Sequence, residues 1–382
     1  MSRDYLHRTK KAAAPIVTLV CLLLVNAPPA LAAQDMWTGI NRIVAVGDVH
    51  GDFEQFVSVL RAAGVIDGSG KWIGGKTHLV QTGDVVDRGP DSRKAMDLLM
   101  TLEKQARKAG GQVHALIGNH EAMNVYGDLR YKNPAEYDAF RDRNSEKLRE
   151  LFWQAYQEQL RTSSPEVKVD EAYRAKWEAE YPLGFVEQRQ QFAPKGAYGK
   201  WIVGHNAAVR INDILFVHGG ISPAYASTPL RQINDRIREE LRDFAKLEGG
   251  MTMDDEGPLW YRGLMEGEED PLRRHVETVL SNLGVTRIVV GHTTTGGALT
   301  PRFGGKVIGI DVGLSGVYGG PPACLVVEKG QFYAIHRGVK LELPLGPGAD
   351  VAVYLKKAEA LEPPGSTLKR ALSLQEPNPI AK

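Results

Sequence analysis

The sequence predicts an α/β fold in which strands and helices alternate along the first part of the chain. Short runs rich in Val and Ile, each bounded by glycine, are typical of buried strands. Between these runs lie longer stretches with the pattern of helices, so the alternation indicates a doubly wound α/β arrangement. An apolar fraction of 43% over 382 residues is sufficient for one sizeable buried core.

The expected elements follow in order along the chain. We expect strands at residues 42–46, 78–82, 113–117, 214–217 and 287–290, and helices at residues 53–63 and 92–108. In residues 127–199 apolar side chains recur at helical spacing within a strongly charged background, which predicts an amphipathic helical insertion. Strand signals resume in residues 201–336, including a pair at 323–327 and 331–335 around a turn.

These elements define one domain at residues 37–345, with the insertion inside it. Residues 362–382 are polar and contain prolines, so we expect a flexible C-terminal tail. The formal net charge of +1 gives no reason to expect a nucleic-acid or membrane-surface partner. Any preference for anionic ligands must therefore come from a local site.

Residues 1–32 have the features of a signal peptide that is removed on export. Basic residues precede a mostly apolar stretch, and Ala30-Leu31-Ala32 has the small residues of a cleavage site. The apolar stretch is shorter than the ~20 residues that cross a bilayer, so we expect no membrane anchor after cleavage. The mature protein is expected to be periplasmic or secreted, with Cys324 as its remaining cysteine and no intramolecular disulfide.

Metal-ligand residues lie where the predicted strands end. The motifs are Gly47-Asp48-Val49-His50-Gly51, Gly83-Asp84-Val85-Val86-Asp87-Arg88-Gly89, Gly118-Asn119-His120-Glu121, His218-Gly219-Gly220, Gly291-His292-Thr293 and Ile310-Asp311. Glycines let the backbone turn sharply there, and Asp, His and Asn supply donors that suit divalent first-row metals. The strand ends are therefore expected to form a metal site in one crevice.

The spacing of these residues predicts two metal ions. Asp48 and His50 are one residue apart and can face the same ion, while Asp84 can bridge to a second ion. The second ion would be completed by Asn119, His218 and His292. Two ions about 3.5–4 Å apart would share a hydroxide that attacks phosphorus, so that no protein nucleophile is needed.

A phosphoester site also needs a proton donor and cationic groups. His120 directly follows a predicted ligand and is the candidate general acid, with Asp87 as the carboxylate that orients it. Arg88 can present a planar guanidinium to the phosphoryl oxygens, and Arg262 is a second candidate for this role. Asn119 is expected to contact the phosphate as well as a metal ion.

The ordered motifs resemble those of the phosphoprotein phosphatases in the calcineurin-like metallophosphoesterase superfamily. Residues 258–262 and 290–293 look most like the bacterial branch that includes the Shewanella-like phosphatases. The resemblance spans residues 43–335 and implies a central β-sandwich flanked by helices, with a Mn, Fe or Zn pair at the strand ends. It also implies the metal-ligand, acid and phosphate-binding roles given above for the matching residues.

The chain departs from this resemblance at one late segment. Residues 310–316 read Ile-Asp-Val-Gly-Leu-Ser-Gly, whereas the eukaryotic Ser/Thr enzymes carry Ser-Ala-Pro-Asn-Tyr after the last histidine. We therefore do not expect their inhibitor sensitivity or substrate preference to carry over. The long insertion after Gly-Asn-His-Glu is also unlike those enzymes, although similar caps occur in the bacterial branch.

The histidines outside the motifs are expected to have structural or solvated roles. His78 and His114 lie in predicted strands and His275 on a charged helix. His205 is expected in a loop, with the edge of the site as the alternative. For Asp311 two roles stay open, because it either supports His292 from behind or has no part in the site.

Aromatic residues of the insertion have two expected roles. Phe152, Trp153 and Tyr156 are expected on its buried face. Tyr126, Tyr131 and Tyr137 lie nearer the motifs and could line a substrate groove.

Three classes of function are compatible with these residues. The leading one is a secreted phosphatase that acts on Ser/Thr or Tyr phosphate of proteins by direct attack of a metal-bridging hydroxide. The alternative is a dinucleoside polyphosphate hydrolase of the diadenosine tetraphosphate type, and export disfavours it because these dinucleotides are cytosolic. The third is a non-catalytic binding domain, which the complete ligand set disfavours, since a decayed site would lose costly buried groups.

Overall fold

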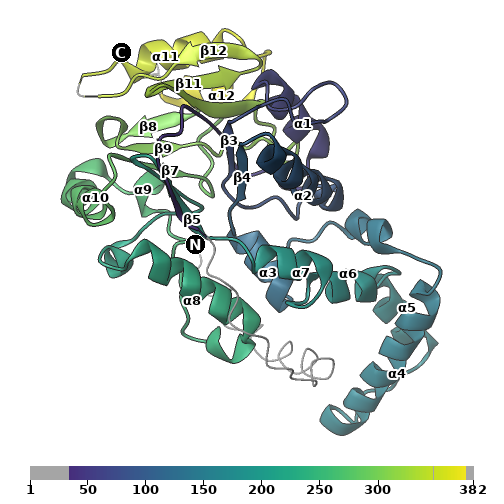
Figure 1. The fold of residues 1–382 in the computed structure, drawn as a ribbon. Helices are drawn as coiled ribbons and strands as arrows, with labels where there is room; N and C mark the ends of the chain where they lie inside the picture. The colour runs from purple at the N-terminus through teal and green to yellow at the C-terminus, as the bar shows by residue number, and fades with distance from the viewer. Residues whose placement is uncertain (1–33, 347, 376–382) are drawn as a thin grey trace, which may run out of the picture. The chain divides into compact units, whose positions relative to one another are not determined.

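The structure, a computed structural model, describes residues 34–346 and 348–375. In this part of the chain two six-stranded mixed sheets pack against each other and helices flank them (Figure 1). The predicted α/β fold, a central β-sandwich flanked by helices, is thus confirmed. The predicted signal peptide at residues 1–32 lies outside the described residues.

The first sheet has the strand order β12-β11-β10-β2-β3-β4. Its strands are β2 (Arg42–Val46), β3 (His78–Gln81), β4 (Gln112–Ala115), β10 (Ala323–Glu328), β11 (Gln331–His336) and β12 (Val339–Glu342). Strands β2, β3 and β4 are parallel, with Ile43 opposite His78 and His78 opposite Gln112. Their carboxyl ends therefore lie at the same edge of the sheet. Strand β10 runs antiparallel to β2 and connects it to β11 and β12.

The second sheet has the order β1-β5-β6-β7-β9-β8. Its strands are β1 (Met36–Trp37), β5 (Ala208–Ile211), β6 (Ile214–Val217), β7 (Arg287–Val290), β8 (Thr300–Arg302) and β9 (Val307–Gly309). Strands β6, β7 and β9 are parallel to one another. The residues that follow β6 and β7 consequently emerge on one edge, as do those that follow β2, β3 and β4 in the first sheet.

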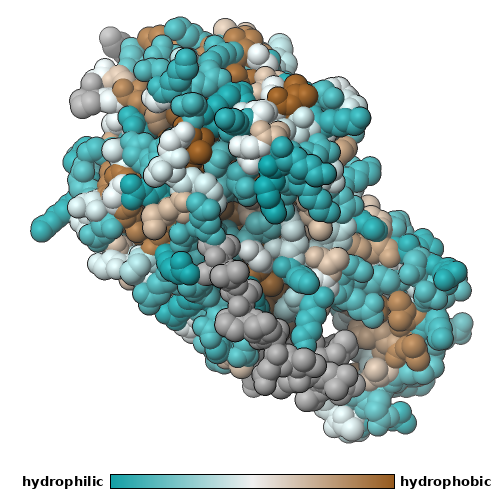
Figure 2. Space-filling view, viewed as in Figure 1, coloured by the Kyte–Doolittle hydropathy of each residue, from teal (hydrophilic) through white to brown (hydrophobic). Residues whose placement is uncertain are grey.

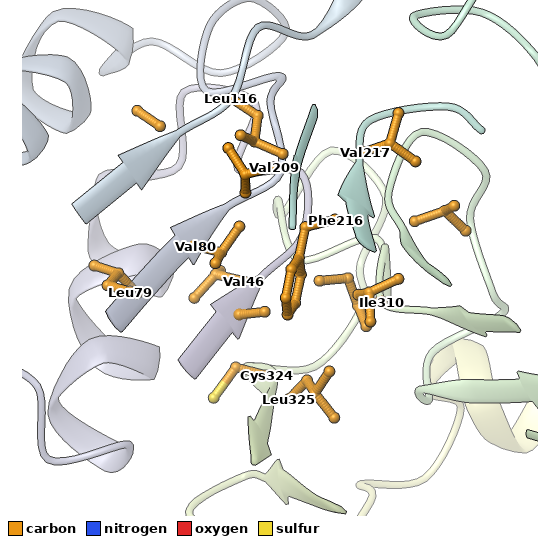
Figure 3. Close-up of a cluster of buried hydrophobic side chains, with 14 of the residues drawn as sticks. Val46, Leu79, Val80, Leu116, Val209, Phe216, Val217, Ile310, Cys324 and Leu325 are labelled. Atoms are coloured by element: carbon orange, nitrogen blue, oxygen red, sulfur yellow. The ribbon is translucent and has the colours of Figure 1, made fainter. Parts of the chain in front are cut away.

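Side chains from both sheets form the core between them (Figure 3). The ring of Phe216 on β6 lies between the two sets of strands and is completely buried, like Val46 and Val80 of the first sheet. Burying a side chain of this size contributes about 1.5–3 kcal/mol. Cys324 on β10 also belongs to this core, where burial raises the pKa of its thiol to about 12, as expected for a structural cysteine.

Helices flank the sheets (Figure 1). They are α1 (Phe53–Ala62), α2 (Ser92–Lys108), α3 (Asn119–Tyr126), α8 (Leu230–Arg242), α9 (Gly263–Glu266) and α10 (Glu269–Leu283), with short 3-10 turns η3 (Pro223–Tyr225), η4 (Phe244–Lys246) and η5 (Phe303–Gly305). Helix α1 begins where the Asp52 carboxylate accepts a hydrogen bond from the Gln55 backbone N–H at 3.1 Å. Its apolar face buries Phe56 and Leu60 against the core.

The insertion is helical in the structure. It contains η2 (Pro134–Phe140), α4 (Ser145–Ser163), α5 (Glu171–Glu180), α6 (Phe185–Phe192) and α7 (Ala197–Ile202). Helices α4 and α5 pack through aromatic rings, and the buried Trp153 and Trp177 lie with centroids 4.8 Å apart. Phe152 and Tyr156 also contact Trp177, so these aromatic residues form the contact between the two helices.

The C-terminal part of the described chain is helical. Helices α11 (Val351–Glu359) and α12 (Thr367–Gln375) follow the last strand. The Glu362 carboxylate is buried and bonds to His336 at 2.8 Å and to Arg337 at 2.7 Å, and Leu368 is buried on α12. The contacts of Glu362 and Leu368 hold this segment against the rest of the protein. They involve few residues, so the mostly polar composition of the segment does not indicate them. Residues 376–382 lie outside the described part.

Hydrophilic residues cover most of the face shown in Figure 2. Hydrophobic residues on this face form small, separate groups, as is normal for surfaces of globular proteins. Within residues 34–375, as far as they are described, no helix is both long and apolar enough to cross a membrane.

Candidate active site

The motif residues meet at the carboxyl ends of five strands, three from one sheet and two from the other. Asp48 and His50 follow β2, and Asp84, Asp87 and Arg88 follow β3. Asn119 and His120 begin α3 after β4, whereas His218 follows β6 and His292 follows β7. Both sheets therefore contribute predicted residues to the same site, which lies at the carboxyl ends of these strands.

The loops reach the site through unusual backbone conformations. Five non-glycine site residues have positive φ angles: His50 (46°), Asp84 (59°), Asp87 (70°), Arg88 (69°) and His292 (63°). Such conformations are unfavourable and gather at functional sites. Glycines allow the close approach, because a Cβ on Gly47 would lie 2.5 Å from the Ile310 carbonyl oxygen and one on Gly291 would lie 2.5 Å from Asp48 Oδ1.

One group of donors contains Asp84, Asn119, His218 and His292. His218 Nδ1 lies 2.9 Å from the Thr82 carbonyl oxygen, which can only accept, so Nδ1 carries the proton and Nε2 has a free lone pair. His218 Nε2 faces Asn119 Oδ1 at 2.8 Å, His292 Nδ1 at 3.1 Å and Asp84 Oδ1 at 3.4 Å.

His292 contributes a second imidazole lone pair to this group. Its Nε2 lies 3.1 Å from the Trp260 carbonyl oxygen and donates there, which leaves Nδ1 unprotonated. Two imidazole lone pairs and a carboxylate oxygen thus converge, all within 4.8 Å of one another. A divalent ion would satisfy these electron-rich atoms, so the residues present fit a metal ion.

A second group surrounds the other oxygen of Asp84. His50 Nδ1 donates to the Val86 carbonyl oxygen at 3.1 Å, and His50 Nε2 lies 3.8 Å from Asp84 Oδ2 and 3.9 Å from Asp48 Oδ2. His120 Nε2 is also 3.8 Å from Asp84 Oδ2, and His50, Asp84 and His120 have the spacing of a metal-binding set. The sequence predicts Asp48, rather than His120, as a ligand here, and both side chains lie beside this second group.

The carboxylates of the site crowd one another in a buried space. Burial, followed by the charges of Asp311 and Asp84, raises the pKa of Asp48 well above its ordinary value. Burial raises the pKa of Asp311 to about 6. Burial also opposes ionisation of Asp84, yet electrostatic interaction with the His218 and His120 rings holds its pKa well below its ordinary value. Cations placed among these groups would relieve their repulsion.

Glu121 is a structural residue of the site to which the sequence assigned no role. Its carboxylate accepts backbone N–H groups from Asp84 at 2.7 Å, Val85 at 2.8 Å and Gly118 at 2.9 Å. These bonds join the loop after β3 to the start of α3. Glu121 therefore holds the backbone at Asp84 and Gly118 in place.

His120 and Asp87 form the pair that the sequence predicts. His120 Nδ1 lies 2.7 Å from Asp87 Oδ2, and the other oxygen of Asp87 accepts from the Asn124 amide at 2.9 Å. Burial opposes ionisation of Asp87, but the hydrogen bond from His120 and the charge of Lys132 outweigh it and lower the pKa of Asp87. The pKa of His120 is raised, because the charges of Asp84 and Asp87 outweigh its burial. Both shifts favour the ion pair.

The two arginines lie at different edges of the site. The Arg88 guanidinium stacks 4.2 Å from the ring centroid of Tyr131 and 5.9 Å from that of Tyr318. Its buried Nε has no hydrogen-bond partner among the described residues. Arg262 is exposed and donates from Nη1 to the His292 carbonyl oxygen at 2.7 Å. Tyr318 was missed in the sequence because it lies outside every motif, whereas Tyr131 was a candidate groove residue.

The remaining histidines lie elsewhere. His78 and His114 bond to each other at 3.0 Å, His205 bonds to Glu103 at 2.7 Å, and His275 bonds to the Ile221 carbonyl oxygen at 2.8 Å. These contacts agree with the structural roles expected for them.

Asp311 lies close to the donor cluster. Its Oδ1 accepts from Gly313 N–H at 2.9 Å, and its charge acts on Asp48. Among the described residues we find no hydrogen bond from His292 to this carboxylate. Asp311 therefore adds negative charge beside Asp48, rather than orienting His292.

Comparison with known proteins agrees with this chemistry. The family described as calcineurin-like phosphoesterase matches residues 41–295. The chain is 31% identical to Shewanella-like protein phosphatase 2 of Arabidopsis thaliana over 315 residues. The aligned region covers 76% of this chain and 75% of that protein. It is also 31% identical over 322 residues to an uncharacterised protein of Schizosaccharomyces pombe, with 79% and 82% of the two chains covered.

A solved structure shares the architecture as well. The cold-active protein-tyrosine phosphatase of a psychrophilic Shewanella species matches with a TM-score of 0.64 and 28% identity, covering 82% of this chain and 83% of that one. Together with the clustered His and Asp donors, these matches show a metal-dependent phosphatase with a phosphorylated substrate. The chain belongs to the calcineurin-like phosphoesterase family.

Proposed function

We propose that the protein is a phosphomonoesterase that uses two divalent metal ions to remove phosphate from protein side chains, with phosphotyrosine as the preferred substrate. The observation that carries the proposal is the position of Asp84, whose Oδ1 faces His218 at 3.4 Å while its Oδ2 faces His50 at 3.8 Å. A carboxylate shared between two donor groups is suited to two adjacent ions. The nitrogen and oxygen donors favour Mn, Fe or Zn.

When bound, the ions supply Lewis-acid stabilisation of the phosphoryl charge and lower the pKa of a water molecule for attack on phosphorus. The proposed ligands are Asp48, His50 and Asp84 for one ion and Asp84, Asn119, His218 and His292 for the other. Arg88 would donate to the phosphoryl oxygens, which would satisfy its unpartnered Nε. Arg262 would donate from the side of His292, and the Asn119 amide would contact the phosphate as well.

His120 would transfer a proton from Nε2 to the departing oxygen. Its Nδ1 stays bound to Asp87 throughout, which fixes the ring and stabilises the protonated form. The proton moves from nitrogen to the leaving oxygen as the bond from that oxygen to phosphorus breaks. Water supplies the new oxygen on phosphorus, so no covalent protein intermediate is formed.

Two tyrosines support an aromatic substrate. The ring of Tyr318 packs against His50 with centroids 5.4 Å apart, and the ring of Tyr131 packs against His120 at 5.1 Å. Half-buried aromatic rings beside His50 and His120 offer stacking surfaces to a phosphotyrosine ring. The Shewanella structure with 28% identity is itself named a protein-tyrosine phosphatase.

A substrate panel tests the proposal. Metal-loaded enzyme is assayed with a phosphotyrosine peptide, the matched phosphoserine peptide and diadenosine tetraphosphate. We expect the largest kcat/KM for phosphotyrosine, and Tyr131→Ala and Tyr318→Ala should lower it more than they lower the value for phosphoserine. A preference for diadenosine tetraphosphate would instead support the dinucleoside polyphosphate hydrolase.

Export is part of the proposal. The basic, apolar and small-residue order of residues 1–32 supports removal of a signal peptide and a periplasmic or secreted enzyme without a membrane anchor. The proposed partners are phosphorylated proteins, and the formal net charge of +1 gives no reason to expect nucleic acids as partners.

A further inference from the structure

Lys132 is a buried cation next to the proposed acid pair. It lies between α3 and η2, in the first segment of the insertion, and only 2% of its side chain is exposed. Burying an ammonium group is costly unless it is paired and hydrogen-bonded. The groups that pair with the Lys132 ammonium therefore indicate its role.

Those partners come from four separate parts of the chain. Lys132 Nζ lies 3.5 Å from Asp87 Oδ1 and 3.2 Å from Asn124 Oδ1, and it forms an ion pair with Glu136. The ring of Phe192 on α6 lies 5.2 Å from Nζ. The ammonium group thus links the loop after β3 to α3, η2 and α6.

The two carboxylate oxygens of Asp87 have different partners. Oδ2 bonds to His120 Nδ1, whereas Oδ1 receives the Asn124 amide and faces Lys132. A carboxylate held at both oxygens cannot rotate freely, so its bond to the imidazole keeps one direction. The Asp87 backbone is held as well, because its N–H donates to Ser92 Oγ at 3.0 Å.

We propose that Lys132 is a positioning residue that fixes Asp87 and, through it, the His120 ring for proton transfer. The insertion then contributes to catalysis, since α6 supports the same network. Gln188 on α6 donates to Asn124 Oδ1 at 3.0 Å, the atom that also faces Lys132. This inference rests on the proposed acid role of His120.

A purely structural role is the competing explanation. Lys132 could merely neutralise Glu136, whose side chain is 1% exposed and which also needs a partner. In that case its loss would weaken folding and would lower activity on all substrates alike. A positioning role instead predicts that the loss depends on how much each reaction needs the acid.

The test compares Lys132→Met with the wild type and with His120→Asn. Poor leaving groups need a proton most, so Lys132→Met should lower kcat on a phosphoserine peptide by about 10–100-fold, as is typical for residues that orient a catalytic group. The loss on p-nitrophenyl phosphate should be distinctly smaller, and KM should change little because Lys132 does not contact substrate. In the His120→Asn background, the same substitution should cause no further loss.

Two controls separate this effect from misfolding. Lys132→Met with Glu136→Met replaces the ion pair by apolar groups of similar length, which avoids an unpaired buried carboxylate. Lys132→Arg keeps the charge and should retain most of the phosphoserine activity. Arg174→Met is the matched insertion control, because Arg174 pairs with Glu150 at 2.9 Å and Glu178 at 2.6 Å, both on the insertion helices.

The outcomes are distinguishable. A leaving-group-dependent loss that disappears in the His120→Asn background supports the inference. An equal loss on all substrates from Lys132→Met, while His120→Asn alone discriminates between them, overturns the role of Lys132 and leaves the proposed function intact. If His120→Asn itself acts equally on all substrates, the proposed acid role and the inference from it both fail.

Discussion

Replacing His120 with Asn removes the proposed proton donor and its hydrogen bond to Asp87. We expect both losses to lower catalytic activity. The His120–Asp87 bond is 2.7 Å long and buried, and a hydrogen bond to a charged group contributes about 1.5–3 kcal/mol. Losing that bond alone would affect every substrate equally. Loss of general acid catalysis is larger, about 10²–10⁴-fold, or roughly 3–5 kcal/mol in the barrier, and it depends on the leaving group.

Leaving groups of different basicity separate the two effects. The phenol of tyrosine has a pKa of about 10, whereas the alkoxide of serine is a far stronger base and needs the proton more. We expect a loss of about 10²–10⁴-fold in kcat/KM for a phosphoserine peptide, and a distinctly smaller loss for phosphotyrosine and p-nitrophenyl phosphate. The assay is kcat/KM on all three substrates, with metal content measured on each preparation.

Two results would refute this reasoning. Equal losses across the three substrates would leave His120 as a positioning or phosphate-binding residue. Loss of a metal ion from the variant would instead assign His120 to the metal ligands, as its position 3.8 Å from Asp84 Oδ2 permits. Unchanged metal content with unequal losses is the expected outcome.

The remaining predictions concern metal binding, phosphate binding, export and stability. Asp84→Asn should leave about one ion per chain, since a neutral amide holds two cations together poorly; two ions with near wild-type turnover would exclude the bridge. Arg88→Lys should lower kcat/KM about 10–100-fold, because an ammonium group cannot replace the planar fork, and an unchanged value would remove Arg88 from phosphate binding. Expression with the leader in a Gram-negative host should give a mature chain that begins at or near Ala33, and an intact mass that retains residues 1–32 would contradict export. Glu362→Ala should destabilise the protein by about 1–3 kcal/mol, because Arg337 loses its carboxylate; an unchanged melting temperature would show that this contact does not anchor the C-terminal segment.

Strands could be predicted where apolar runs end at a glycine. The ranges 42–46, 214–217 and 287–290 agree residue for residue with β2, β6 and β7. Strand β4 begins one residue earlier than predicted, and it ends before Ile117, because the Ile117 N–H donates instead to the Asn206 carbonyl oxygen at 3.0 Å. The short β8 and β9 were missed, since three residues carry too little periodicity to stand out.

The donor cluster could be predicted because each of its members is tied to a strand end by a short motif. Its surroundings could not be predicted, because contacts across long sequence separations leave no local pattern. Lys132 and Asp87 are 45 residues apart in the sequence. No regular helical or strand spacing relates two residues at that separation, so the sequence does not predict their contact. Tyr318 likewise reaches His50 only through the return of the chain after β9.

Strain and charge repulsion in the site must be offset by the rest of the fold. Five residues at positive φ, each unfavourable by about 1–3 kcal/mol, are held next to crowded buried carboxylates. The three backbone hydrogen bonds to Glu121 and the rigid ends of β2, β3, β6 and β7 keep these loops from relaxing. A looser scaffold would let Asp48 and Asp84 move apart, which would relieve the repulsion but separate the two donor groups. The buried sandwich core thus supplies the stability that keeps a costly arrangement of donors in place for the metal ions.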